Sequence, residues 1–233
     1  MNNPYHVLPP LIPDHLIERL LVLSPALLCD GMQNLGIPRN GCMDANLLPI
    51  DEHKTMIGTA CTVDTQDGDN FPVHVAIYQG APGYVLVVAG KGYQERAYMG
   101  DLMVGAAQAV GFNGVVIDGC IRDKTALAEL TIPVYAKGVM PRSPAKKGPG
   151  KINSAVMCAG IDVSPGDLVF GDGDGVVIVP REHIEAVIAE AEKKLAYEIR
   201  RREVIAQYSQ CRSNQQPLPE LAPDWVTRLL KEM

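Results

Sequence analysis

The 233-residue chain lacks the hydrophobic segments that would place it in a membrane or send it out of the cell. No apolar run reaches the roughly 18 residues that are needed to cross a bilayer. The first residues, Met1-Asn2-Asn3-Pro4, do not show the charged stretch and apolar stretch of a signal peptide. We therefore expect a cytoplasmic protein without a membrane partner.

Patterns of paired cysteines and an excess of positive charge are also missing. None of the six cysteines forms a CxxC pair or has the spacing of a metal finger, which predicts reduced, structural thiols. The net charge of -6 argues against a nucleic-acid partner, because phosphates would select a basic face. Hydrophobic residues make up 47% of the chain, which is enough for one buried core.

The most informative stretch that is present is Gly114–Ile121, followed by Arg122 and Asp123. Its β-branched apolar residues predict a buried strand, which delivers the two charged residues to the strand's carboxyl end. Ligands bind at that end of the strands in open α/β sheets. An arginine offers a planar fork of donors for a carboxylate or enolate, and an aspartate offers an oxygen ligand for a divalent cation. The alternative is a solvated ion pair of little energetic value.

The spacing to Asp101 favours a ligand site over a solvated ion pair. Twenty residues separate Asp101 from Arg122, and they are predicted to form a helix that ends at Gly111 and then the strand. A helix that runs antiparallel to the following strand returns the chain to its starting point. We therefore expect Asp101, at the helix start, to lie beside Arg122 and Asp123.

Several motifs together resemble the family of the 4-hydroxy-4-methyl-2-oxoglutarate/4-carboxy-4-hydroxy-2-oxoadipate aldolases and of RraA, the regulator of ribonuclease activity A. The motifs lie between about residues 17 and 202 and are Gly58-Thr59-Ala60, Gly68-Asp69-Asn70 with His74, Gly100-Asp101, Val116-Ile117-Asp118-Gly119-Cys120-Ile121-Arg122-Asp123, Pro165-Gly166-Asp167 and Gly171-Asp172-Gly173-Asp174-Gly175-Val176-Val177. Aldolases of this family carry an Asp, twenty residues and then Arg-Asp. Other members carry a different first residue and an acid three residues after the pair. With Asp101, and with Ala126 where the other pattern has the acid, this chain resembles the aldolases.

The resemblance implies an α/β fold of the swivelling-domain type, a layered β/β/α sandwich that assembles as homotrimers or homohexamers. The sequence pattern adds N-terminal helices and a long C-terminal helix. We expect a single domain over residues 1–233, with a core of about 17–202 and a C-terminal extension of about 210–233.

The order of the elements predicted from the sequence agrees with this class, because helix-rich βα units precede a half with many short strands. The predicted helices lie at about 15–23, 25–35, 101–110, 125–130 and 181–208, with a further helix that begins after a capping Asp69-Asn70. The predicted strands lie at 56–65, 84–89, 114–121 and 134–136, with short strands and turns over 154–179. Residues 141–150, rich in Pro, Gly and Lys, are predicted to form a mobile loop.

The resemblance implies a class II pyruvate aldolase that acts on branched 4-hydroxy-2-keto acids in the degradation of aromatic compounds. Because retro-aldol cleavage leaves pyruvate enolate, the site must hold negative charge on the C2 oxygen. We expect Asp123 to bind Mg²⁺, Mn²⁺ or Co²⁺, Arg122 to stabilise the oxygen, and Asp101 to orient metal-bound water or move protons. The backbone N–H groups of Gly100, Asp101, Leu102 and Met103 suit the pyruvyl carboxylate. Oxaloacetate decarboxylation passes through the same enolate and is an expected side activity.

Glu198 has two interpretations. It lies beside the apolar stripe of the last long helix, where Lys194 and Arg202 are placed to form intrahelical ion pairs with it. The resemblance implies a different role, because a glutamate of the corresponding helix of the aldolases reaches the active site of a neighbouring subunit. On that basis Glu198 is a third candidate catalytic residue, in a site shared between subunits.

Two other classes of function compete with this one. A Schiff-base aldolase would use a lysine such as Lys91 or Lys137, although neither follows a pattern that predicts a lowered pKa. A regulator that binds ribonuclease E through its surface, as some relatives do, would need no metal. His74 is predicted to lie near the site without an assigned chemical role.

Overall fold

The computed structural model describes residues 4–232, in which a mixed sheet of eight strands forms the centre. The strand order is β1-β5-β4-β3-β2-β9-β10, with β6 paired to β2, while β7 and β8 form a separate hairpin. The strands are β1 (Leu48–Pro49), β2 (Met56–Thr65), β3 (Tyr84–Met99), β4 (Gly114–Ile121), β5 (Val134–Val139), β6 (Gly150–Ile152), β7 (Val156–Cys158), β8 (Ile161–Val163), β9 (Leu168–Asp172) and β10 (Gly175–Val179). The α-helices are α1 (Asp14–Leu20), α2 (Pro25–Asn34), α3 (Phe71–Tyr78), α4 (Asp101–Val110), α5 (Lys124–Glu129), α6 (Ile184–Ser213) and α7 (Asp224–Glu232).

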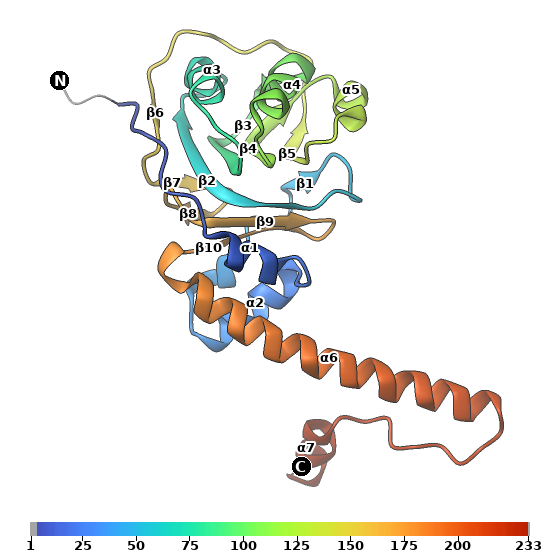
Figure 1. The fold of residues 1–233 in the computed structure, drawn as a ribbon. Coiled ribbons are helices and arrows are strands. Elements are labelled where there is room, and N and C mark those ends of the chain that lie inside the picture. Colours follow the sequence, from blue (N-terminus) through green and yellow to red (C-terminus); the bar gives the residue numbers. More distant parts are fainter. Residues whose placement is uncertain (1–3, 233) are drawn as a thin grey trace.

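The elements are layered, as expected for a β/β/α sandwich (Figure 1). Helices α3, α4 and α5 cover one face of the parallel strands β2 to β5, and β7 to β10 lie against the other face. Helices α1, α2 and α6 pack on the outer side of β9 and β10. All eight residues of β4 are buried, because both of its faces are covered. The central strands therefore have a fixed position from which their carboxyl ends can present side chains.

Several predicted helix ends are confirmed. The Oγ of Ser24 accepts a hydrogen bond from the N–H of Leu27 (3.3 Å), and Pro25 follows as the first residue of α2. Gly111 ends α4 with a φ of 100°, a left-handed conformation that a side chain would strain. Of the predicted cap Asp69-Asn70, the part assigned to Asn70 is wrong, because its side chain makes no capping hydrogen bond. Asp69 takes this role, since its Oδ1 accepts a hydrogen bond from the N–H of Phe71 (2.9 Å).

The structure extends the elements predicted from the sequence in three places. Strand β3 continues to Met99 rather than ending at residue 89, through register shifts between Val88 and Met99. Helix α6 begins after a 3₁₀ turn and runs to Ser213, and the sequence analysis missed α7. Hydrogen bonds to Gly68, Asp69 and Ala97 hold residues 142–148, so the loop predicted to be mobile is fixed at several points.

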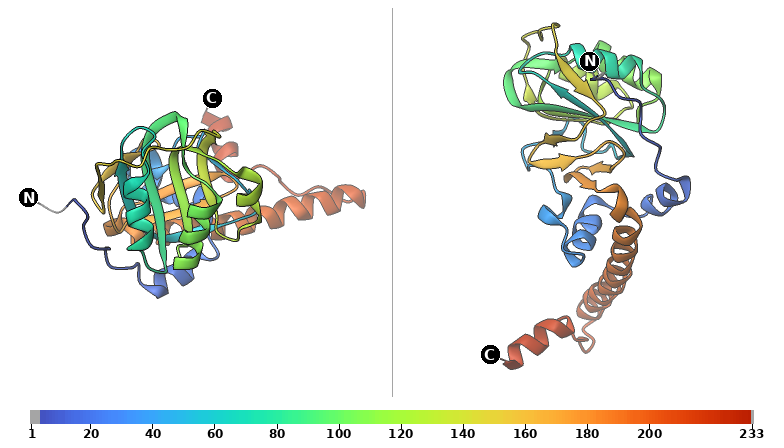
Figure 2. Two further views of the ribbon diagram at one scale, coloured as in Figure 1. Left: turned by 90° about the horizontal axis from the view of Figure 1, so that it is seen from above. Right: turned by 90° about the vertical axis from the view of Figure 1, so that its left-hand side faces the viewer.

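The second half of α6 and α7 project from the layered body (Figures 1 and 2). The buried residues of α6 end at Ala191, and along the same stripe Ile199 is already half exposed. No helix within residues 4–232 is both long and apolar enough to span a bilayer.

Candidate functional site

The start of α4 and the end of β4 meet, as the spacing of Asp101 and Arg122 predicts. The N–H of Arg122 donates a hydrogen bond to the carbonyl of Met99 (3.0 Å), which joins the two chain segments directly before the helix. A Cβ atom on Gly100 would lie 2.3 Å from Oδ2 of Asp123 and 3.0 Å from Cγ of Arg122. The glycine backbone therefore lies in contact with both charged side chains, and Asp101 follows it directly.

Arg122 and Asp123 are held in a defined arrangement with each other. Asp123 has a φ of 59°, a left-handed conformation that is uncommon outside glycine and is found at functional sites. Its Oδ2 lies 3.3 Å from Nε of Arg122, and the two side chains are 40% and 38% exposed. The Nη1 of Arg122 donates a hydrogen bond to Oγ of Ser143 (3.0 Å). One edge of the guanidinium is thus oriented by protein groups while the site stays open to solvent.

The N-terminus of α4 carries no side-chain cap, so its first N–H groups point out of the helix. One of them is already engaged, because the N–H of Leu102 donates to Oδ1 of Asp101 (2.8 Å). Gly100, Asp101, Leu102 and Met103 all line a cavity of about 170 Å³ beside this helix end, together with Arg122. An uncapped helix start next to an arginine is suited to an anion.

A second wall of this cavity comes from α3 and from the loop between β5 and β6. Asn70, His74 and Lys146 line it. The amide of Asn70 donates to the carbonyl of Tyr98 (2.9 Å) and to Sδ of Met103, while its Oδ1 is buried without a hydrogen-bond partner.

The loop residues 141–149, here called the strap, are fixed over the cavity by Asp69. The buried carboxylate of Asp69 accepts hydrogen bonds from the N–H groups of Lys147 (2.7 Å) and Gly148 (3.2 Å). The N–H of Ala145 donates to the carbonyl of Gly68 (2.7 Å). Sequence reasoning predicted a loop at residues 141–150 but did not foresee its attachment to Gly68 and Asp69.

The strap brings a positive charge to the cavity. Burial and the charge of Lys146 lower the pKa of His74, so its imidazole is neutral at pH 7. None of the ion pairs among residues 4–232 involves Lys146. This ammonium group is therefore open to an anionic ligand.

The donor set at Asp123 fits a weakly held divalent cation. Among the described residues, no group of three or more His, Cys, Asp and Glu side chains is placed to hold a metal ion. Asp123 is not among the residues that line the cavity, but its carboxylate is partly exposed and lies against Gly100 and Arg122 at the cavity edge. A single hard carboxylate with open positions suits Mg²⁺ and its waters, and does not suit a closed zinc cage.

Within one chain the structure does not bring Glu198 to this cavity. Its Oε2 lies 2.7 Å from Nη2 of Arg202, which is the intrahelical pair that the sequence allows. Helix α6 packs with α1 and α2, on the side of the molecule opposite to α3 and α4 (Figure 1). The role of Glu198 in a neighbouring subunit stays a prediction.

Comparison with known proteins finds the same family that the sequence motifs resemble. A family model described as RraA-like, Aldolase/RraA, matches residues 25–178. A protein of Halalkalibacterium halodurans, provisionally named a 4-hydroxy-4-methyl-2-oxoglutarate aldolase, is 38% identical over 167 residues, which are 72% of this chain and 76% of that protein.

Solved structures share the fold. An uncharacterized protein from Pseudomonas syringae pv. tomato superposes with a TM-score of 0.75 at 28% identity, covering 84% of this chain and 94% of that one. RraAS2 of Streptomyces coelicolor, described as an unusual member of the RNase ES inhibitor RraA family, gives a TM-score of 0.72 at 27% identity, covering 82% and 98%.

Proposed function

Because the chain belongs to the RraA-like, Aldolase/RraA family, we propose that it is a divalent-metal-dependent pyruvate aldolase. Its substrate is a 4-hydroxy-2-keto acid such as 4-hydroxy-4-methyl-2-oxoglutarate or 4-carboxy-4-hydroxy-2-oxoadipate. The observation that carries this proposal is the contact of Gly100 with both Arg122 and Asp123, at the open start of α4. This contact brings together an uncapped helix start, a guanidinium and a carboxylate, which supports an anion site and a metal ligand in one place.

Cleavage breaks the bond between C3 and C4 of the substrate, and the electron pair moves to the C2 oxygen as the enolate of pyruvate forms. Arg122 is suited to stabilise that oxygen, because Ser143 and Asp123 fix its guanidinium before the charge develops. The proton of the C4 hydroxyl has to leave in the same step, and C3 has to gain a proton afterwards. Asp101, next to the helix start, is the candidate for holding or moving these protons.

The substrate's C1 carboxylate is placed against the N-terminus of α4, where the N–H groups of Asp101 and Met103 complement it. Asp123 would hold the metal ion, which when bound supplies Lewis-acid polarisation of the keto oxygen. The same arrangement supports decarboxylation of oxaloacetate, since loss of CO₂ leaves the same enolate.

The second wall of the cavity favours a substrate with a further carboxylate. Lys146 is a cation without an ion-pair partner among the described residues, and Asn70 and His74 lie in the same wall. An ammonium group beside a neutral imidazole can bind a carboxylate at the C4 end of the substrate. This argues for branched dicarboxylic and tricarboxylic keto acids over simple ones.

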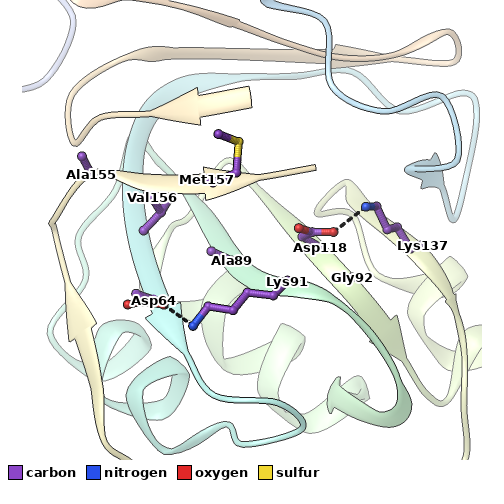
Figure 3. Close-up of a pocket in the computed structure, with 9 residues that line it drawn as sticks. All are labelled: Asp64, Ala89, Lys91, Gly92, Asp118, Lys137, Ala155, Val156 and Met157. Atoms are coloured by element: carbon purple, nitrogen blue, oxygen red, sulfur yellow. Dashed lines mark ion pairs between the residues drawn. The ribbon is translucent and has the colours of Figure 1, made fainter. Parts of the chain in front are cut away.

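A Schiff-base mechanism finds no support at the two lysines that the sequence offers. Burial lowers the pKa of Lys137, but hydrogen bonds to Asp118 and Asp44 outweigh this effect and raise it. Lys91 forms an ion pair with Asp64 (3.1 Å). Lys137 is therefore held as an ammonium ion, which cannot attack a carbonyl group, and the amino group of Lys91 is engaged by a carboxylate (Figure 3).

We further propose that the protein is a homotrimer or homohexamer in which Glu198 of one subunit completes the cavity of another. The support from this chain is that α6 projects from the body and that Ile199, beside Glu198, is half exposed. A helix with an apolar stripe that is exposed in one subunit is suited to pack against a second one.

The experiment measures pyruvate release from a panel of 4-hydroxy-2-keto acids, from oxaloacetate and from 2-oxoglutarate, which lacks the C4 hydroxyl and is the unreactive control. Each reaction is run with enzyme treated with EDTA and again after Mg²⁺ is returned. We expect release from the branched keto acids to stop after chelation and to return with the metal. Full release after exhaustive chelation would refute metal dependence, and no release from any substrate would refute the aldolase.

The alternative is a ribonuclease regulator, which the name of the Streptomyces coelicolor relative supports. Such a protein acts through its surface and does not use the cavity. Inhibition of ribonuclease E by the wild type and equally by an Asp123→Ala variant would favour this function.

A further inference from the structure

We propose that Arg96 is a positioning residue of the cavity at Arg122, on which it acts through Ser143 of the strap. Arg96 belongs to β3 and does not line the cavity. Its role is to hold the guanidinium of Arg122 in place before a substrate binds. The expected effect on rate rests on the proposed aldolase function, whereas the effect on the position of Arg122 can be measured without any substrate.

Ser143 is held by two arginines, one on its side chain and one on its backbone. Its Oγ accepts a hydrogen bond from Nη1 of Arg122 (3.0 Å). Its carbonyl oxygen accepts a hydrogen bond from Nη1 of Arg96 (2.7 Å). Such a short distance is typical of a charged donor, whose hydrogen bonds are roughly twice as strong as those between neutral groups. Arg96 therefore fixes the peptide unit from which Ser143 presents its hydroxyl group to Arg122.

Two neighbouring residues of β3 hold this end of the strap. The N–H of Ala97 donates a hydrogen bond to the carbonyl of Arg142 (2.9 Å), and the side chain of Arg96 donates to the next carbonyl, that of Ser143. This part of the strap forms neither helix nor strand. The contacts of Asp69 hold the strap further along the chain. The position of Ser143 therefore depends on β3, and on Arg96 in particular.

The side chain of Arg96 is itself placed by Gly68. A Cβ atom on Gly68 would lie 2.7 Å from Cδ of Arg96 and 3.1 Å from its Cβ, so the arginine stem lies directly on the glycine backbone. Gly68 has a φ of 66°, a left-handed conformation that residues with a side chain rarely adopt. The carbonyl of the same glycine accepts a hydrogen bond from the N–H of Ala145 (2.7 Å). One turn thus supports both Arg96 and the strap that Arg96 holds.

The guanidinium of Arg96 is available to the strap, because no ion pair within residues 4–232 involves it. The residue is partly buried, with its stem against Gly68 and its charged end at the exposed Ser143. This placement is usual for arginine, whose stem packs on the protein while its charge stays near water. A methionine at position 96 can keep the packing but not the hydrogen bond, which makes Arg96→Met a selective change.

Two contacts fix the guanidinium of Arg122, and Arg96 controls one of them. Oδ2 of Asp123 lies 3.3 Å from its Nε, and Ser143 binds its Nη1. Two contacts on different nitrogens define the plane of the group, whereas a single contact leaves it free to rotate. A donor that is held before negative charge develops does not have to be oriented during the reaction. Without Arg96 the contact with Ser143 weakens, and Arg122 points less often at the reacting oxygen.

The test compares Arg96→Met with matched variants of the full-length protein. Arg96→Lys keeps the charge and a donor but loses the planar fork, and it carries the same test if Arg96→Met does not fold. Ser143→Ala removes the hydroxyl group that binds Arg122, and Arg96→Met is also made in that background. Arg142→Met is the control, because Arg142 holds the strap through its carbonyl and its exposed side chain lies 4.0 Å from Glu95.

Two NMR signals are followed without substrate. The Nε–Hε signal of Arg122, assigned from Arg122→Lys, reports the orientation of its guanidinium. We expect Arg96→Met and Ser143→Ala to shift this signal in the same direction, Arg96→Lys to shift it less, and Arg142→Met to leave it in place. The pKa of His74, which burial and the charge of Lys146 lower, should stay as in the wild type, because Asp69 still holds the strap next to Lys146.

Steady-state pyruvate release tests the consequence for the reaction. We expect Arg96→Met to lower kcat about tenfold with little change in KM, which corresponds to the loss of about one hydrogen bond to a charged group. In the Ser143→Ala background the same change should lower kcat less than about twofold, because the two residues act through one chain of contacts. Arg142→Met should release pyruvate like the wild type.

An Arg122 signal that Arg96→Met leaves unchanged would overturn the proposal, as would an equal loss of kcat with and without the Ser143 hydroxyl. A rise in KM alone would also overturn it. So would a raised pKa of His74, because the whole strap would then have come loose. If the wild type releases no pyruvate from any substrate, the aldolase proposal fails, and the Arg122 signal alone decides the role of Arg96.

Discussion

Replacing Gly100 by alanine tests whether the contact between α4 and β4 organises the site. The backbone of Gly100 is extended, with φ of −138° and ψ of −168°, so alanine causes no backbone strain. Its Cβ atom would lie 2.3 Å from Oδ2 of Asp123, where ordinary contacts are 3.4 Å or longer. The carboxylate therefore has to move by about 1 Å, and Cγ of Arg122 has to move by a few tenths of an ångström.

A displacement of about 1 Å in a positioned catalytic group costs on the order of 10² in rate. We expect the kcat of Gly100→Ala for pyruvate release to fall by about that factor, while the protein stays folded. The assay is steady-state pyruvate release with saturating Mg²⁺, together with thermal unfolding.

The matched control is Gly105→Ala on the same helix. A Cβ atom on Gly105 would meet nothing within 4 Å, so the change only replaces a flexible residue in a helix interior. Stability should rise by about 0.5–1 kcal/mol and Tm by about 1–4 °C, with kcat unchanged. If Gly100→Ala keeps kcat within about threefold of wild type, the positioning of Arg122 and Asp123 by this contact is refuted.

Three further predictions concern other residues of the proposed site. Arg122→Lys keeps the charge but loses the planar fork, so kcat should fall by about 10² or more; a rise in KM alone would assign Arg122 to ground-state binding. Inactive Glu198→Ala and Asp123→Ala proteins should recover part of their activity when they are mixed and exchange subunits, whereas exchange verified by mass spectrometry without recovery would rule out a shared site. Lys146→Met removes a nearby positive charge and should raise the pKa of His74 in an NMR titration. An unchanged titration would place Lys146 away from the ring.

The part of the site that the sequence predicts is the part built by local chain geometry. A helix and a strand of ordinary length connect Asp101 to Arg122, and their antiparallel return brings both ends together. The burial of β4 follows from its composition alone. The contact between the start of α4 and the end of β4 joins residues only about twenty positions apart, so the local sequence pattern is enough to predict it.

Of the second wall, only the position of His74 near the site was predicted, because the rest depends on contacts between distant residues. The strap has no periodic pattern, and its anchor Asp69 precedes Lys147 by 78 positions. The extension of β3 was missed for a different reason, since the polar segment around Lys91 interrupts the apolar run from which the strand was predicted. Asn70 was interpreted as a local cap, but it reaches Tyr98 and Met103 instead.

The attachment of the strap separates the parts of the site that can vary from those that cannot. Arg122 and Asp123 stand on a strand end that is buried on both sides, whereas Ser143 and Lys146 stand on a loop held mainly through its backbone. The carboxylate of Asp69 binds N–H groups, which every residue except proline supplies. Side chains of the strap that do not orient Arg122, such as Lys146, can therefore be exchanged while its path is kept. Substrate preference can be redesigned there, or diverge among related proteins, without rebuilding the groups that break the bond.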